Sequence, residues 1–96
     1  MYAVVRRYTN ASQLSDALVQ HLDEIRTILS GVPGFKAYHA LRTEDGGLVT
    51  MTVCEDQAGT QESSRRAAEW VRQNLTGAAM AAPEITEGEA FLQFSR

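Results

Sequence analysis

The chain has 96 residues, a net charge of −3 and one cysteine, Cys54. This length predicts a single domain over residues 1–96, the lone thiol excludes a disulfide framework and fits a reducing compartment, and the mixed charges exclude an extended basic face for nucleic acid. No apolar run approaches the roughly 20 residues that cross a membrane, and the opening MYAVVRRYT lacks a signal-peptide core. We therefore expect a cytoplasmic domain without membrane or nucleic-acid partners, and with too few histidines and cysteines for a metal cluster.

The first two predicted elements are a strand and a long helix. Residues 2–9 are β-branched and aromatic, which favours a strand. Asn10 is expected to cap the following helix, with Gln13 completing a capping box. Gly31 is expected to end this helix after about five turns. Apolar residues recur along it at helical spacing: Leu14, Leu18, Leu22, Ile25 and Leu29.

A helix-ending turn leads into a predicted hairpin. Gly34 lies between Pro33 and an aromatic run, where we expect the backbone to require a positive φ. Residues 35–42 are the second predicted strand. The dipeptide Asp45-Gly46 is a strong hairpin signal, so residues 48–54 follow as the third strand.

The remaining residues predict a helix and a final strand. The helix begins in the segment EDQAGTQE, whose acids suit a helix N-terminus, and is expected to end at Gly77; its apolar stripe is Ala67, Ala68, Val71 and Leu75. The last strand is expected at about residues 89–94. The order β-α-β-β-α-β, with right-handed crossovers, predicts a ferredoxin-like α+β fold in which two helices cover one face of a four-stranded antiparallel sheet.

The strands carry two different faces. One set of alternating residues is apolar and is expected to meet the helices: Ala3, Val5, Val49, Met51, Val53, Ala90, Leu92 and Phe94. The other set mixes aromatic and aliphatic groups with polar ones: Tyr2, Val4, Arg6, Tyr8, Leu48, Thr50, Thr52, Cys54, Phe91 and Gln93. Each large apolar side chain of this set that stays exposed to water loses roughly 1.5–3 kcal/mol of stabilisation that its burial would give. We therefore expect a homodimer in which the mixed faces of two sheets pack together around a cavity.

Strand two is ambiguous, because either of its alternating sets suits the helix side. If Phe35 faces the helices, period-two alternation places Tyr38 on the opposite face, in the cavity. A one-residue bulge between them reverses this assignment.

Three segments carry a resemblance to a known superfamily. MYAVVRRY, VPGFKAY and CEDQAGTQESSRRAAEWVRQNL resemble a group of small, uncharacterised bacterial proteins of the dimeric α+β barrel superfamily, alongside the antibiotic biosynthesis monooxygenase (ABM) domains. The resemblance covers nearly the whole chain. It implies this fold, a homodimer and a cavity for a small hydrophobic or aromatic ligand, but it leaves the activity open because one fold serves many reactions.

The resemblance to ABM oxygenases implies chemistry without a metal, a flavin or another cofactor. The substrate itself supplies an electron-rich carbanion or enolate, and the protein removes a phenol proton and holds negative charge in a dry pocket. Arg6 is the candidate for stabilising an oxyanion, and Tyr8 and Tyr38 are candidates for positioning or relaying a proton. Alternatively, the aromatic groups pack an interface and Arg6 pairs with an acid.

Trp70, His39 and Phe91 are candidate substrate-binding residues. Trp70 lies beside the apolar stripe of its helix and is either an aromatic at the edge of the core or, as in haem-degrading relatives, a cavity wall. Those relatives carry a histidine soon after the tryptophan, and here no histidine follows His39, which argues against haem degradation. His39 is either a general base or a hydrogen-bonded structural residue.

Three functions therefore remain open from the sequence. The chain is an ABM-like monooxygenase, a non-catalytic binder of a small ligand, or a dimer with an interaction role whose cavity its own side chains fill.

Overall fold

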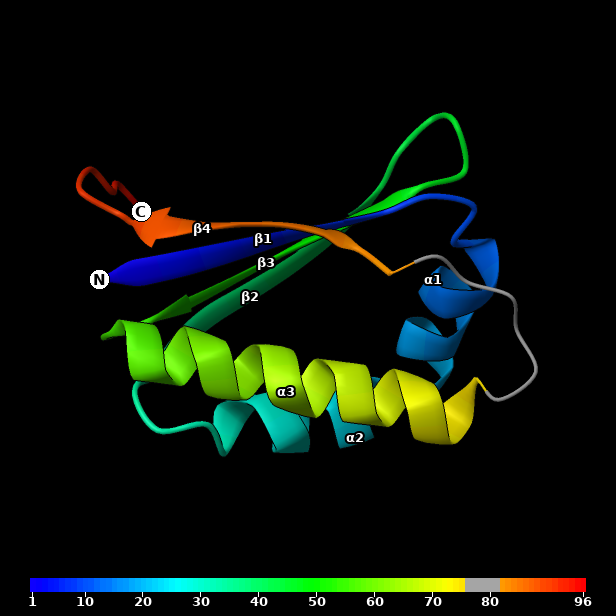
Figure 1. The fold of residues 1–96 in the computed structure, drawn as a ribbon, viewed down its shortest axis with the longest axis horizontal. Coiled ribbons are helices and arrows are strands. Elements are labelled where there is room, and N and C mark those ends of the chain that lie inside the picture. The colour runs from blue at the N-terminus through cyan, green and yellow to red at the C-terminus, as the bar shows by residue number, and fades with distance from the viewer. Residues whose placement is uncertain (76–81) are drawn as a thin grey trace.

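The computed structural model describes residues 1–75 and 82–96, which form one antiparallel sheet covered on one face by three helices (Figure 1). The sheet order is β2-β3-β1-β4. This confirms the predicted ferredoxin-like arrangement, with the first helix divided in two. The elements are β1 (Tyr2–Tyr8), α1 (Ser12–Gln20), α2 (Leu22–Ser30), β2 (Phe35–Arg42), β3 (Leu48–Cys54), α3 (Gln57–Asn74) and β4 (Glu84–Glu89).

The predicted five-turn helix is broken at His21. His21 has φ −111° and ψ 31°, ending α1 and preceding α2. Asn10 is not the cap: it has φ 49°, and α1 follows Ala11 without a side-chain cap. The backbone N–H of Ala11 donates to Gly46 O at 2.9 Å, which ties the helix start to the hairpin turn. Asn10 tolerates the left-handed conformation that this tie requires.

The last strand lies earlier in the chain than predicted. β4 pairs with β1 from Tyr2↔Glu89 to Arg7↔Glu84, whereas residues 90–96 have no regular structure. The sequence of β4, EITEGE, is poor in strand-forming residues but suits an edge, where charges oppose strand-to-strand aggregation. The predicted end of α3 at Gly77 lies outside the described residues.

The two faces of the sheet are opposite to the prediction. Val4, Arg6 and Tyr8 are buried on the helix side, beside Thr50 and Thr52 of β3. Five members of the predicted apolar set face away from the helices: Ala3, Val5, Val49, Met51 and Val53. Together with Ala37 and His39 of β2 they form what we call the open face.

Helix α3 explains the inversion, because it presents hydroxyl groups to the sheet. Thr60 and Ser63 are fully buried on this helix, and their hydroxyls pair with polar groups of the strands. A polar strand face opposite a polar helix face can form hydrogen bonds inside the fold, and here Arg6 Nε and Thr50 Oγ1 are buried atoms without a partner among the described residues.

A bulge in β2 decides where Tyr38 lies. Phe35 is opposite Cys54 and Ala37 is opposite Val53, so Lys36 is an extra residue in the ladder. Phe35 and Tyr38 consequently both face the helices. The expectation that they face opposite sides of the sheet is wrong, because the strand contains the one-residue bulge that would reverse it.

Gly34 adopts φ +77°, as the sequence predicts. A Cβ there would lie 3.3 Å from Glu55 Cβ. We expect Gly34→Ala to lower the free energy of unfolding by about 1 kcal/mol or more, measured by urea denaturation.

Gly31 is the matched control in the same turn: its φ is −79°, and a Cβ there would make an equally close contact, 3.3 Å, with the flexible end of the Arg66 side chain, so the two variants differ chiefly in backbone conformation. We expect Gly31→Ala to change the stability by no more than about 0.5 kcal/mol. Equal losses for both variants would contradict a conformational role for Gly34.

Candidate functional site

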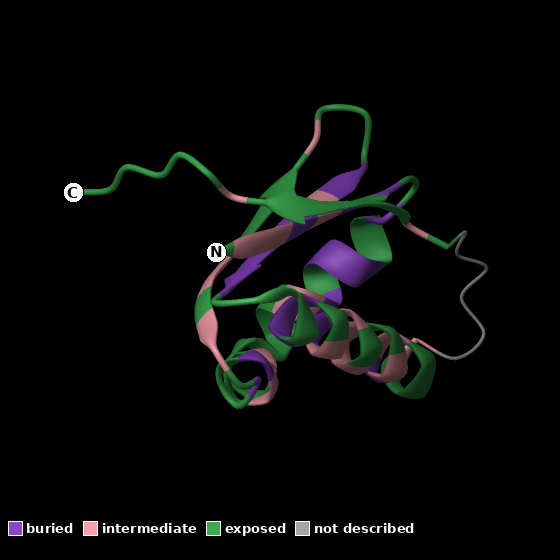
Figure 2. Cartoon of the chain, turned by 60° about the vertical axis from the view of Figure 1, so that its left-hand side comes forward, coloured by how far each residue is buried: buried purple, intermediate pink, exposed green. Residues whose placement is uncertain are grey.

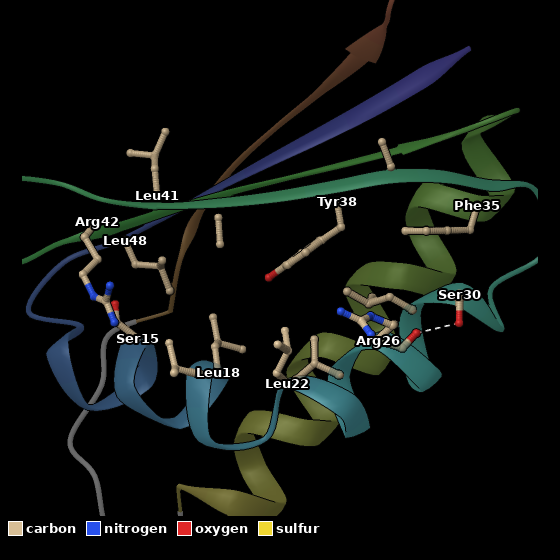
Figure 3. A pocket seen from close by; sticks show the side chains of 15 residues that line it. Ser15, Leu18, Leu22, Arg26, Ser30, Phe35, Tyr38, Leu41, Arg42 and Leu48 are labelled. Atoms are coloured by element: carbon tan, nitrogen blue, oxygen red, sulfur yellow. Dashed lines mark hydrogen bonds between the residues drawn. The ribbon is translucent and has the colours of Figure 1, made fainter. Parts of the chain in front are cut away.

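A cleft of about 560 Å³ opens between the sheet and helices α1 and α2. Tyr38 projects from β2 into it, opposite the leucines of the two helices (Figure 3). This volume is within the range of small-molecule sites, roughly 300–1,000 Å³. Most of the lining is apolar, including Leu18, Leu22, Ile25, Leu29, Phe35 and Leu48.

A smaller space of about 30 Å³, which we call the inner chamber, adjoins the cleft and shares Leu18, Ile25 and Tyr38 with it. Its lining adds side chains from β1, β3 and α3: Arg6, Tyr8, Thr50, Arg66 and Trp70. The site therefore has an apolar outer part and a polar inner end.

Arg6 is a buried cation held by hydroxyl groups. It is 2 % exposed. Its Nη1 donates to Thr52 Oγ1 at 3.1 Å, and its Nη2 donates to the hydroxyls of Ser63 and Ser64 at 2.9 Å each. Its Nε has no hydrogen-bond partner among the described residues.

Arg6 also lacks an ion pair within the described part of the chain, and residues 76–81 contain no acidic side chain. Glu87 acts on it only through longer-range Coulombic attraction, since its carboxylate accepts from the Thr60 hydroxyl. Burial lowers the pKa of Arg6 below its ordinary value, but an arginine stays protonated in proteins. The structure therefore does not show the alternative in which Arg6 pairs with an acid. Hydroxyl groups compensate the buried charge only in part, and no described carboxylate forms an ion pair with it.

Both neighbouring tyrosines remain protonated at neutral pH. Burial raises the pKa of Tyr8 and of Tyr38, and the positive charge of Arg6 opposes each rise. A phenol with a raised pKa is a hydrogen-bond donor rather than a base at pH 7. The inner chamber can therefore hold negative charge but does not itself remove a proton readily.

Trp70 is fixed in the wall of the inner chamber. It is buried, and its Nε1–H donates to Glu24 Oε1 at 3.1 Å. The His21 ring meets it edge-on at 5.6 Å between centroids. Glu24 and His21 thereby connect the α1–α2 break to α3.

The structure brings four of the six candidate residues together and leaves two apart. Arg6, Tyr8, Tyr38 and Trp70 all line the inner chamber. His39 lies on the open face opposite Met51, and Phe91 is 86 % exposed in the C-terminal segment. Arg6, Tyr8 and Tyr38 thus lie on the helix side of the sheet and not on the face that was expected to meet a second sheet.

Sequence reasoning missed the serines that hold Arg6 and the helix residues that wall the cleft. Ser63 and Ser64 look like solvated helix residues in isolation. The signal that could have shown otherwise is Thr60, which precedes Ser63 by three residues and so shares its helix face as part of a polar stripe. Leu18 and Leu22 were assigned to a core, but α1 and α2 stand far enough from β2 to leave the cleft open beside them.

The described residues contain no group of three or more His, Cys, Asp or Glu side chains that could hold a metal ion. Neither histidine lines the cleft or the inner chamber, so these residues do not supply the histidine ligand expected for haem degradation. In the same part of the chain, every helix is too short or too polar to cross a membrane.

Comparisons with solved structures identify the fold. The NE2512 protein of unknown function from Nitrosomonas europaea is similar over 99 % of this chain and 93 % of its own, with 20 % identity and a TM-score of 0.73. SnoaB, a cofactor-independent oxygenase from Streptomyces nogalater, is similar over 99 % and 97 %, with 18 % identity and a TM-score of 0.65. MhuD, a heme-degrader from Mycobacterium tuberculosis, is similar over 99 % and 100 %, with 13 % identity and a TM-score of 0.69.

These similarities confirm the resemblance at the level of fold: the chain has the same ferredoxin-like fold as these proteins. No protein-family model matches the sequence, and no curated protein matches it. At these identities the activity must be argued from the site.

A buried charge without an ion pair costs stability, which predicts an unusual mutational result. We expect the free energy of unfolding of Arg6→Met to stay within about 1 kcal/mol of the parent value, because an apolar side chain of similar length replaces a charge that is compensated only in part. We expect Arg6→Ala to lose about 2–4 kcal/mol through the cavity that it leaves. Urea denaturation of both variants tests this, and an equal loss for Arg6→Met would make Arg6 a structural residue.

Proposed function

We propose that the protein is a cofactor-independent monooxygenase that binds a small, partly aromatic substrate with an acidic hydroxyl group in the cleft. The observation that carries this proposal is the Arg6 guanidinium, buried without a carboxylate beside the tyrosines of the inner chamber. Buried charges in proteins are paired. We therefore infer that an anionic ligand supplies the negative charge that pairs with Arg6.

The proposed reaction needs only the substrate and oxygen. A phenol with a C–H group para to its hydroxyl reacts as its phenolate with O₂; the carbon gains one oxygen as a carbonyl, and the second oxygen leaves as water. The substrate supplies all the electrons. Arg6 stabilises the phenolate oxygen, and the Tyr38 hydroxyl donates to the same oxygen or to the reduced oxygen species.

The protein's second candidate function is non-catalytic binding of the same ligands. The cleft and the inner chamber have no Asp, Glu or His in their described lining, so the proton must leave to solvent or to reduced oxygen. A binder needs no such step.

We further propose that two chains form a homodimer through their open faces. Val5 and Met51 are only partly covered there, and the helices lie on the other side of the sheet. The C-terminal segment extends from the body (Figure 2), exposing Phe91, Leu92 and Phe94. Covering each recovers roughly 1.5–3 kcal/mol, and the cleft stays accessible because it lies on the helix side.

Oxygen uptake with 1-naphthol, and formation of 1,4-naphthoquinone, tests the activity. We expect Arg6→Met to lower kcat/KM about 100-fold or more, because the developing negative charge loses its buried partner. We expect about a tenfold loss for Tyr38→Phe, which removes one hydrogen bond to that charge.

Arg72→Gln is the matched control, since Arg72 is an exposed α3 residue outside the cleft. It should leave the rate unchanged. Binding of naphthols without oxygen uptake by the parent would favour the non-catalytic candidate. Oxygen uptake that survives in Arg6→Met would remove Arg6 from the mechanism.

Sedimentation tests the dimer. At micromolar concentration we expect a mass twice the 10.6 kDa of the chain. Met51→Glu should dissociate the dimer, because it buries a charge in an apolar interface, whereas Val19→Glu on exposed α1 should not. A monomeric parent would contradict packing of the open faces.

A further inference from the structure

All the charged side chains that line the cleft and the inner chamber are arginines. Arg26 and Arg42 line the cleft, and Arg6 and Arg66 line the inner chamber. Among the described lining residues there is no aspartate, glutamate or lysine. The chain carries a net charge of −3, so this concentration of positive charge is opposite in sign to the molecule as a whole.

Two of these arginines are available at the outside of the cleft. Arg26 Nη1 is 3.8 Å from Asp23 Oδ1, and Arg42 Nη2 is 4.0 Å from Asp16 Oδ1; all four side chains are mostly exposed. Exposed pairs with such long contacts contribute little to stability. Arg26 and Arg42, which we call the rim arginines, can therefore exchange these partners for a ligand.

Arg66 is committed elsewhere. Its Nε donates to Glu62 Oε2 at 2.7 Å, and its Nη1 donates to the Ile28 carbonyl at 3.1 Å. It shares the Glu62 carboxylate with Arg65, and its two contacts join α3 to α2 rather than leaving its donors free for a ligand. The ligand-directed positive groups are then Arg6 at the inner end and the rim arginines outside.

The rim arginines lie apart, with the apolar lining between them. In Figure 3, Arg42 is beside Ser15 at one end of the cleft and Arg26 is near Ser30 at the other, while Tyr38 lies between them. A ligand whose hydroxyl reaches Tyr38 and Arg6 would place its apolar body against leucines. Its outer end would then come close to a rim arginine.

We propose that the cleft selects an elongated aromatic acid: an apolar body with an acidic hydroxyl at the inner end and a carboxylate at the outer end. Arg6 and Tyr38 take the hydroxyl, and a rim arginine takes the carboxylate. The planar guanidinium fork matches the two oxygens of a carboxylate. This inference deepens the proposed function, on whose cleft it rests, by naming the specificity-determining charge at its rim.

Three matched probes test the charge preference: 6-hydroxy-2-naphthoate, its methyl ester, and 2-naphthol. Trp70 is the only tryptophan and lines the inner chamber, so its fluorescence reports binding, and calorimetry checks the affinities. We expect the acid to bind about tenfold more tightly than the ester at low salt, as for one charge-assisted contact. Added salt should reduce this difference. 2-Naphthyl phosphate, as a fourth probe, compares a phosphate with the carboxylate.

Arg26→Gln, Arg42→Gln and the double variant identify the responsible residue. We expect the double variant to abolish the preference for the acid while leaving the ester unchanged, and we expect Arg72→Gln, the control, to retain the preference. Equal binding of acid and ester by the parent, a preference that survives in the double variant, or a preference for the phosphate over the carboxylate would overturn the inference.

The outcomes separate this inference from the oxygenase proposal. The naphthol probes of this series have no C–H group para to the hydroxyl, so they test binding, and 1-naphthol tests oxygen uptake. A preference for the acid, with no oxygen uptake on 1-naphthol, leaves the inference standing and rejects the enzyme. Oxygen uptake on 1-naphthol without a charge preference among the binding probes rejects only the inference. If none of the probes binds, the cleft is not a site for such ligands, and both are rejected.

Discussion

The polar packing between the sheet and α3 is organised around one buried guanidinium. Arg6 stands in the middle strand pair, where solvent cannot reach it, and desolvation makes its charge costly. Hydroxyls from β3 and α3 compensate in part. Helix α3, which covers this part of the sheet, therefore presents serines to Arg6. Larger apolar side chains would pack more tightly there, so the serines leave polar groups and space between the sheet and the helix.

This requirement explains why the element order was predictable and the faces were not. Gly34 and Asp45-Gly46 act through local backbone chemistry, so the turns were readable from short segments. The direction of Arg6 depends on Ser63 and Ser64, 57 and 58 residues away. Alternation along one strand defines two faces but does not say which one a distant helix covers. The bulge at Lys36 and the use of the glutamate-rich segment as β4 likewise depend on pairing partners.

The sheet thus has two faces with different physical properties. The helix side holds the polar groups, and the open face holds aliphatic side chains such as Val5 and Met51. An apolar face suits contact with another apolar surface, because burial there needs no hydrogen-bond partners. The proposed homodimer contact and the proposed ligand site therefore lie on opposite sides of the sheet, so neither surface would have to serve both.

The chemistry available in the cleft is limited by what its lining can accept. Arg6 and the protonated Tyr8 and Tyr38 are donors, and the described lining supplies no carboxylate or imidazole. Such a site stabilises an anion by lowering the pKa of a bound acid, since an adjacent positive charge favours the ionised form. The proton of the acid then leaves to water before the ligand is fully bound, or to the reduced oxygen species afterwards. A lining of this kind favours ligands that are already acidic over ligands that require a strong base, so acidity is the property on which selection in this cleft depends.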